Sequence, residues 1–550
     1  MQRAAFLARA ALSRTALRRT QPRTLVPPRV AAAAPSLRLL PPLRHASHAA
    51  PAAQRSDAPL DASLDRLLPE SLFGAPAPAA SSSAAGEAPR PLPRALARAV
   101  VARVLAQLRA ASDAPTLEQA RREESECNAM VRADLIMASY DLASLHLLAT
   151  SLLRHSRDPR RQPIAFRLFA IAHGSDPMQT PDPTHASGSD APELAASGST
   201  APGYSWASMI LSGAAPPPLG FHLLRDDAAR TDARRAQAAA ATRIYAALAM
   251  QQDGMGMLGM GRLLLQRLPH IDDGAERAKL RDRAVALWRA AAKKGVADAW
   301  FELGVLHLDG KLLPKSEEQA FELFELGAAG GNARAHHALG VLLSTRAAAK
   351  DPPQTDESRN GTLARSLHHF VEGARRGDAQ SAHMAGLRFL LREELLTQVA
   401  GEMAEAEMLE VQQEARRRHE KEWGVPPDDA QARLYFERAS ELGSLPASLN
   451  LAGLLVEARG GAAPASEEDA YSARLAELRR AEQLYTRVAG LAGVGAGNAT
   501  ADGASEASAG EQQMAQMADF ARKAVENVQA MAREVVQLRD EAGAPGQRGQ

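Results

Sequence analysis

Histidine is the residue type that most strongly suggests chemistry in this sequence. Five histidines lie close together along the chain: His336, His337, His368, His369 and His383. Imidazole is a common ligand of zinc and copper, so two doublets and a single histidine could form a metal site. Adjacent residues point apart on a helix, however, so a doublet would supply one ligand to a given site. We therefore predict no bound metal, and we expect surface or packing roles or contact with a ligand.

A glycine string offers a second candidate chemistry. Gly254, Gly256 and Gly259 match the G-x-G-x-x-G spacing of dinucleotide-binding folds. Such a site needs the string between a strand and a helix, with an acidic residue about 20 positions later. Here a helical pattern around Tyr245 precedes the string, and Leu258-Gly259 resembles a pair that recurs further along the chain. We predict that no cofactor binds.

Other reactive residue types give weaker signals. The only cysteine, Cys127, excludes an intrachain disulfide and a cysteine-based zinc site, and we interpret it as an incidental helix residue. Arg416, Arg417 and Arg418 lie among glutamates, which favours a solvated helix over a binding site for RNA or an anionic head group. No phosphate-binding loop, zinc-protease or serine-hydrolase string is present. These observations predict a protein without catalytic activity.

The elements that would position such residues are predicted to be helices throughout. Aromatic residues make up 4% of the chain and alanine is abundant, which favours closely packed helices. One helix pattern recurs, with a small residue, an aromatic residue four positions later, a second small residue after four more, and then a glycine. Its copies are Ala284/Trp288/Ala292/Gly295, Ala320/Phe324/Ala328/Gly331, Ser366/Phe370/Ala374/Gly377, Ala432/Phe436/Ser440/Gly443 and Ala481/Tyr485/Ala489/Gly493, with Ala241/Tyr245/Ala249 as an earlier copy.

A second helix pattern follows the glycine that ends the first. It carries Leu303-Gly304, Leu339-Gly340 and Ala385-Gly386, with Ala452-Gly453 as a looser copy. A glycine inside a helix costs about 1 kcal/mol relative to alanine, so its recurrence suggests a close helix crossing. Ser316 and Asp428 are suitable N-caps for the helices of Phe324 and Phe436.

This alternation resembles the Sel1-like repeat family, a relative of the tetratricopeptide repeats. The match is good for residues 281–345, fair for 360–392 and 427–458, and weak for 130–270. The sequence departs from the family at Gly310–Leu313, where the family's Gly-Val loop is missing, and a tyrosine is missing after the Leu-Gly helix. The resemblance implies an all-α solenoid of helix-turn-helix repeats in a right-handed superhelix, with a concave face that binds proteins.

Changes in composition divide the chain into segments. The predicted segments are a leader over residues 1–46, a disordered Pro/Ala/Ser spacer over 47–93, divergent helical repeats over 94–280 with a disordered loop near 174–203, Sel1-like repeats over 281–493 with a helical insertion near 392–426, a linker over 494–511, and a C-terminal helix over 512–541. The C-terminal helix is amphipathic. We expect it to cap the repeats, although it could instead dock on a partner or associate peripherally with the inner membrane.

The leader and the charge balance bear on location. Residues 1–50 contain nine arginines and no acidic residue, which is typical of a mitochondrial targeting sequence. Without them, 56 basic and 64 acidic residues remain, a net charge of −8. An acidic body is a poor binder of nucleic acid, and no uncharged run is long enough to span a membrane. The prediction is a protein of the matrix or of the matrix face of the inner membrane.

We predict that the protein is a non-catalytic adaptor or scaffold that binds protein clients in its groove. By analogy with other helical-repeat proteins that carry such leaders, the clients would belong to assembly of a respiratory-chain complex such as cytochrome oxidase. The groove residues are predicted to be Trp300, Phe301, His336, His337, His383 and Arg388. The alternatives are a mitochondrial RNA-binding factor in gene expression, and an enzyme whose site lies in residues 94–280.

Overall fold

The computed structural model describes residues 64–73, 90–173, 200–349, 355–390, 405–461, 467–497 and 509–543, apart from single positions inside these ranges. All regular secondary structure in these ranges is helical, so the predicted all-α class is confirmed. The predicted leader, most of the spacer, the loop near 174–199 and most of the 494–511 linker lie outside the described residues. None of the described helices is long and apolar enough to cross a membrane.

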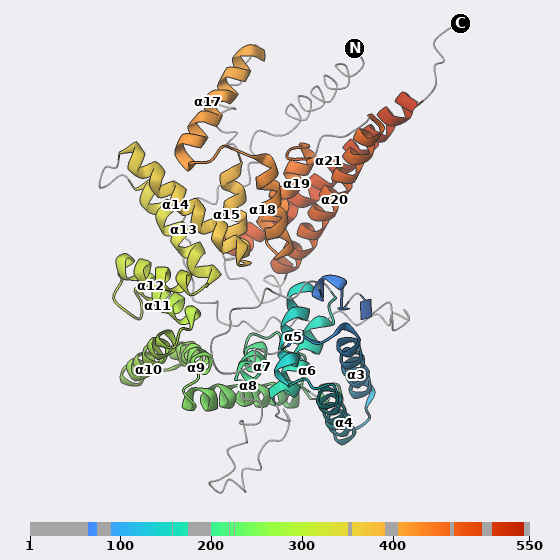
Figure 1. Cartoon of the computed structure of the whole chain (residues 1–550), viewed down its shortest axis with the longest axis vertical. Helices are drawn as coiled ribbons and strands as arrows, with labels where there is room; N and C mark the ends of the chain where they lie inside the picture. Colours follow the sequence, from blue (N-terminus) through green and yellow to red (C-terminus); the bar gives the residue numbers. More distant parts are fainter. Residues whose placement is uncertain are drawn as a thin grey trace. The chain divides into compact units, whose positions relative to one another are not determined.

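The chain divides into two compact units, whose described residues lie on either side of the Leu303–Gly304 bond. The N-terminal unit contains η1 (Glu70–Leu72), α3 (Arg94–Asp113), α4 (Leu117–Met137), α5 (Ala143–His155), α6 (Arg161–His173), α7 (Ala201–Leu211), η2 (Phe221–Leu223), α8 (Asp227–Met250), α9 (Gly254–Arg267), η3 (Leu268–His270) and α10 (Gly274–Lys293). The boundary falls inside α11 (Ala297–Asp309). Figure 1 labels the α-helices of this unit.

The C-terminal unit contains α12 (Glu317–Ala329), α13 (Ala333–Ala348), α14 (Asp356–Arg375), α15 (Ala379–Phe389), α17 (Glu405–Trp423), α18 (Asp429–Glu441), α19 (Leu445–Val456), α20 (Glu467–Gly497) and α21 (Ala509–Gly543). From α12 to α15, and again from α18 to α21, each helix packs against the next one in the chain. The insertion helix α17 is bypassed, because α15 packs directly on α18. This order of contacts is that of a stack of helix pairs.

A two-residue reversal joins each aromatic helix to the next helix. The first residue has a positive φ, which is 86° at Gly295, 91° at Gly331, 90° at Gly377 and 95° at Gly443. Glycine adopts this left-handed conformation without steric cost, and it ends the helix. In three of these four reversals, the following residue accepts a hydrogen bond from the backbone of the next helix; these N-caps are Asn332, Asp378 and Ser444. The predicted helix boundaries are thus explained by turn and cap chemistry.

The glycine nine residues after each reversal lies under an aromatic ring. A Cβ atom added at Gly304, Gly340 or Gly386 would lie 2.6 Å from the ring of Phe324, Phe370 or Phe436, respectively. We call these three glycines, each with its ring, the ring seats. Glycine is required there because any larger residue would push the ring out of a packed core. The mid-helix glycines therefore mark helix crossings, as the sequence predicts.

Two glycines of the predicted pattern are out of register. The reversal before α9 is at Gln252, whose φ is 58°, so the ninth residue after it is Gly261 rather than Gly259. Gly261 contacts the ring of Trp288, whereas Gly259 faces Tyr245. In α19 the ninth residue after Gly443 is Ala452, and a Cβ at Gly453 would meet nothing within 4 Å. The interpretation of Gly259 and Gly453 as equivalents of Gly340 is therefore wrong. Gly259 lies two residues before the ninth position of its helix, and Gly453 lies one residue after it.

Part of the predicted spacer belongs to the folded core. Leu67 and Leu68 are completely buried against α3, α5 and α6, and Leu64 and Leu92 are nearly so. The disorder predicted for 47–93 is therefore wrong for residues 64–73 and 90–93. Composition led to the error, because leucines spaced by three and four residues form an apolar helical face even in a stretch rich in proline and alanine.

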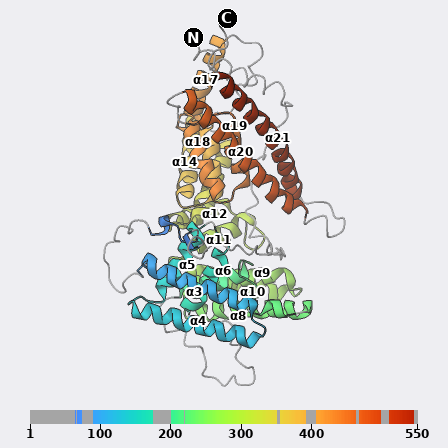
Figure 2. The ribbon, with the colours of Figure 1, turned by 90° about the vertical axis from the view of Figure 1, so that its right-hand side faces the viewer.

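The insertion and the C-terminal helix both pack on the repeats. Ala415, His419 and Trp423 are buried at four-residue intervals along α17, which contacts α14. The C-terminal helix α21 runs along α20, with Phe520 edge-on to Tyr485 at 6.1 Å between ring centroids. Figure 2 shows α20 and α21 side by side. The apolar face of the amphipathic pattern predicted for this helix is the face that α21 packs against α20.

Candidate functional site

The histidine doublet on α13 points in two directions. The Nδ1 atom of His336 lies 3.1 Å from the Nδ1 atom of His369 on α14. The ring of His337 instead packs on Phe370, with 5.8 Å between centroids, and its Nδ1 atom lies 3.7 Å from the Asp378 carboxylate. The two rings therefore serve separate contacts, as adjacent positions on a helix require.

His383 on α15 repeats the packing of His337. Its ring lies 5.8 Å from the ring of Phe436, the same separation as between His337 and Phe370. Both histidines are the sixth residue after a reversal glycine, and Phe301 is the sixth after Gly295. The Nδ2 atom of Asn450 on α19 lies 2.9 Å from the Nε2 atom of His383. The sixth position is thus a packing position that ties neighbouring helices together.

Burial keeps these imidazoles neutral. Desolvation lowers the pKa of His369 to about 4, with further lowering from His336 and His368, and it lowers the pKa of His383 to about 4, with help from Arg388. The pKa values of His336 and His337 are lowered by burial as well. A neutral His383 can accept a hydrogen bond from Asn450 at Nε2. Within the described ranges, no three His, Cys, Asp or Glu side chains are grouped so that they could hold a metal ion.

The structure encloses some of the residues predicted to line the groove. Phe301 is 1% exposed and His337 is 9% exposed, so neither presents its ring to a ligand. His336 is similarly buried against α14, and Trp300 is partly exposed on α11 in the N-terminal unit. The guanidinium of Arg388 lies 4.5 Å from the ring centre of Trp423, which fixes the insertion helix to α15. The structure therefore assigns packing roles to Phe301 and His337, and a tethering role to Arg388.

The helices α13, α15 and α19 also carry residues that are open to solvent. In the C-terminal unit, partly exposed residues stand at the seventh or tenth position after a reversal: Val341 on α13, Met384 and Leu387 on α15, and Asn450 and Gly453 on α19. Residues three apart share a helix face. We call these five residues the open face. Exposed Arg334 and Gln380, each the third residue after its reversal glycine, continue it toward the N-termini of α13 and α15.

The open face has the chemistry of a contact surface. Three of its four side chains are apolar, and Asn450 carries the fourth, polar one. Gly453 removes a side chain, so the centre of α19 presents backbone and small atoms. Acid–base or nucleophilic catalysis needs a positioned titratable group or hydroxyl, and none of the five residues supplies one. Met384 and Leu387 are adjacent in the sequence to His383 and Arg388, whose side chains instead contact Phe436 and Trp423.

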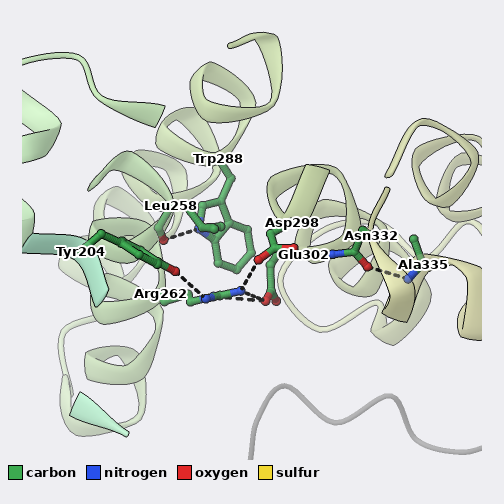
Figure 3. Close-up of polar contacts among 8 residues, drawn as sticks. All are labelled: Tyr204, Leu258, Arg262, Trp288, Asp298, Glu302, Asn332 and Ala335. Carbon is green, nitrogen blue, oxygen red and sulfur yellow. Dashed lines mark hydrogen bonds and ion pairs between the residues drawn. The ribbon is translucent and has the colours of Figure 1, made fainter. Parts of the chain in front are cut away.

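The N-terminal unit holds a partly buried polar cluster, drawn in Figure 3. Arg262 on α9 donates to the Glu302 carboxylate at 2.7 Å and to the Tyr204 hydroxyl at 3.2 Å, and Asp298 lies 4.0 Å away. Burial by itself would lower the pKa of Arg262, but the Glu302 carboxylate raises it, so the charge is permanent. The cluster joins α7, α9 and α11, and the charge of Arg262 is paired with Glu302. It is a structural tie and offers no support for an enzyme in residues 94–280.

Comparison with known proteins gives one family match. The profile described as Sel1 repeat matches residues 297–332, which form α11 and α12, and residues 417–444, which form the end of α17 and α18. A search of curated proteins found no match.

Two solved structures match this chain. A protective antigen of uropathogenic Escherichia coli, described as displaying an SLR fold, is 15% identical, with a TM-score of 0.32 over 82% of this chain and 76% of its own. A Sel1 repeat protein from Oxalobacter formigenes is 15% identical, with a TM-score of 0.31 over 60% of this chain and 98% of its own.

Proposed function

This chain is a Sel1-like repeat protein, and we propose that it is a non-catalytic scaffold that binds other proteins through the open face of α13, α15 and α19. The observation that carries the proposal is the partial exposure of Val341, Met384 and Leu387 on neighbouring helices. Apolar side chains that remain partly in water gain free energy when a partner covers them, at about 25 cal/mol per Å².

The composition of the open face suits a peptide or helix of a client protein. Methionine is flexible and polarisable, so Met384 can adapt to different apolar side chains. Asn450 can both donate and accept hydrogen bonds, although His383 already engages its amide group. Arg334 and Gln380 stand at one end, where they can pair with polar groups of the client. The client is therefore expected to bind by apolar contact along α13, α15 and α19 and by polar contact at their N-terminal ends.

A matched pair of leucine substitutions tests this assignment. Leu387→Glu places a charge on the open face, and Leu434→Glu places the same charge on α18, where Leu434 is 59% exposed. We expect Leu387→Glu to lower the recovery of co-purified clients at least tenfold, with Leu434→Glu retaining normal recovery. Circular dichroism and thermal melting would show that both variants are folded. Equal recovery of clients with both variants would remove the open face from the proposal.

We further propose that the scaffold acts in mitochondria, in the matrix or on the matrix face of the inner membrane. The arginine-rich, acid-free residues 1–46 support this location. Import of the full chain into isolated mitochondria should yield a shortened, protease-protected product only when a membrane potential is present. Full-length product that stays protease-sensitive would contradict the location.

The finer proposal is that the clients are proteins of respiratory-chain assembly, with cytochrome oxidase as the example. Loss of the protein should lower the amount of one assembled complex while its subunit messenger RNAs are unchanged. The RNA-binding alternative has less support, because Arg334 is the one cation among the described residues of the open face and its continuation. A loss of messenger RNA or of its translation would favour that alternative.

A further inference from the structure

One helix of the N-terminal unit has a strongly basic outer surface. Lys279, Arg283, Arg289 and Lys293 on α10 are all exposed, and exposed Ala286 lies between the second and third. Their spacings of four, three, three and four residues place them on one helix face. We call these five residues the basic stripe. Within the described residues, none of the four cations is part of an ion pair, although α10 contains Asp282 close by.

One helix of the C-terminal unit has the opposite charge. Glu318, Glu322 and Glu325 on α12 are exposed at spacings of four and three residues, and α12 itself contains no Lys or Arg. Leu326, which is 49% exposed, stands beside them. We call these four residues the acidic stripe. Glu317 is not part of it, because its carboxylate pairs with Arg346 at 2.7 Å.

The two stripes are complementary in charge, spacing and apolar content. Lys279 and Arg283 lie four residues apart, as do Glu318 and Glu322, so each pair spans about 6 Å along its helix at 1.5 Å per residue. A basic stripe laid against an acidic stripe would bring opposite charges together and cover Leu326 with the small Ala286.

We propose that two copies of this chain associate by docking the basic stripe on α10 of one copy onto the acidic stripe on α12 of the other. Different surfaces meet in such a contact, so it is heterologous, and each copy retains one free stripe for a further copy. Exposed ion pairs each contribute little free energy, so the association is weak and reversible. Salt should weaken it, because charges at the surface are screened within about 10 Å at 0.1 M ionic strength.

Sedimentation velocity of the purified chain at rising concentration tests the proposal. We expect concentration-dependent growth in mass at low salt, and an apparent dissociation constant that rises at least tenfold as salt is increased to several hundred millimolar. If the protein stays monomeric at every concentration at low salt, the proposal is overturned. The basic stripe would then be expected to bind an anionic partner of another kind. Growth in mass that does not respond to salt would also overturn it.

Charge reversal identifies the surfaces. The variant Lys279→Glu/Arg283→Glu/Arg289→Glu/Lys293→Glu and the variant Glu318→Lys/Glu322→Lys/Glu325→Lys should each stay monomeric, because their stripes now repel the partner stripe of an identical copy. An equimolar mixture of the two variants should associate, since the reversed α10 of one meets the reversed α12 of the other. A chain with both sets of substitutions should regain self-association. Failure of both the mixture and the doubly reversed chain to associate, with helical content intact, would contradict the pairing.

Discussion

The N-terminal helices and the repeats bring helices together in different ways. Between α3 and α7 the core is filled by large aliphatic and aromatic side chains, including Val100, Leu145, Ile164 and Trp206. Between α11 and α18 the rings of Phe324, Phe370 and Phe436 each pack against a glycine of the partner helix. The first arrangement depends on many side chains of similar kind, and the second on one small residue at a fixed place. Only the second arrangement produces a pattern of glycine and aromatic residues that repeats along the sequence.

The comparison predicts that the N-terminal core is most sensitive to loss of a buried charge. Arg167 on α6 pairs with Glu124 on α4, and both side chains are at most 5% exposed. Arg167 also donates to the Asn128 side chain at 2.8 Å. Glu124→Ala leaves the guanidinium buried without its carboxylate, so we expect a loss of about 3–5 kcal/mol in the free energy of unfolding. Urea denaturation measures this loss.

The double variant Glu124→Leu/Arg167→Met serves as the control for that substitution. It removes both charges and keeps apolar volume, so it should be considerably more stable than Glu124→Ala. If the single variant were as stable as the native chain, the ion pair would not be part of the core.

The repeats should instead be most sensitive at the ring seats. Gly340→Ala places a methyl group 2.6 Å from the ring of Phe370, which must then shift. Overpacking of this kind costs about 1–3 kcal/mol, and the better helix propensity of alanine returns about 1 kcal/mol. We expect a net loss of up to about 2 kcal/mol, measured by thermal or urea unfolding.

Gly453 on α19 provides the matched control for Gly340. It is also a mid-helix glycine, but nothing lies within 4 Å of an added Cβ. Gly453→Ala should therefore stabilise the chain by about 0.5–1 kcal/mol. Equal and destabilising effects of the two substitutions would show that glycine serves helix flexibility rather than ring packing.

A smaller effect is expected from pH. The folded-state pKa of His383 is about 4, below its ordinary value of 6.5, so folding favours the neutral ring. Its contribution to stability is complete above pH 6.5 and is lost as pH falls toward 4. The melting temperature should fall over this range, because a protonated His383 can no longer accept from Asn450.

His383→Gln tests this pH dependence. The variant carries no titrating ring, so its melting temperature should fall less on acidification than that of the native chain. An identical fall in both would assign the pH dependence to other groups.

The sequence predicts the repeat region well, because the start and end of each helix there depend on residues that are adjacent in the chain. Gly331 and Gly377 end helices through a left-handed residue, and Asn332 and Asp378 begin the next ones, so the boundaries follow from adjacent residues. The N-terminal helices were predicted as helices without their pairing, since Val100 or Leu145 could pack in many registers. The packed segment around Leu67 and Leu68 was missed because its composition is that of a linker.

The candidate site was predicted less well than the fold. His337 and His383 stand at equivalent positions, and the sequence shows this correctly. Equivalence does not say whether a position faces a neighbouring helix or an open surface, and a shift of one residue turns a helix face by about 100°. Met384 and Leu387 carry no chemical signal of their own, so their exposure became visible only in the folded arrangement.

Site-specific photo-crosslinking tests the central claim, that the open face binds client proteins. A photoreactive phenylalanine analogue would replace Met384 on the open face or Leu434 on α18, and crosslinking would be performed in intact mitochondria. The account predicts discrete protein adducts from position 384 and none from position 434. Adducts of equal intensity from both positions, or none from position 384, would contradict it.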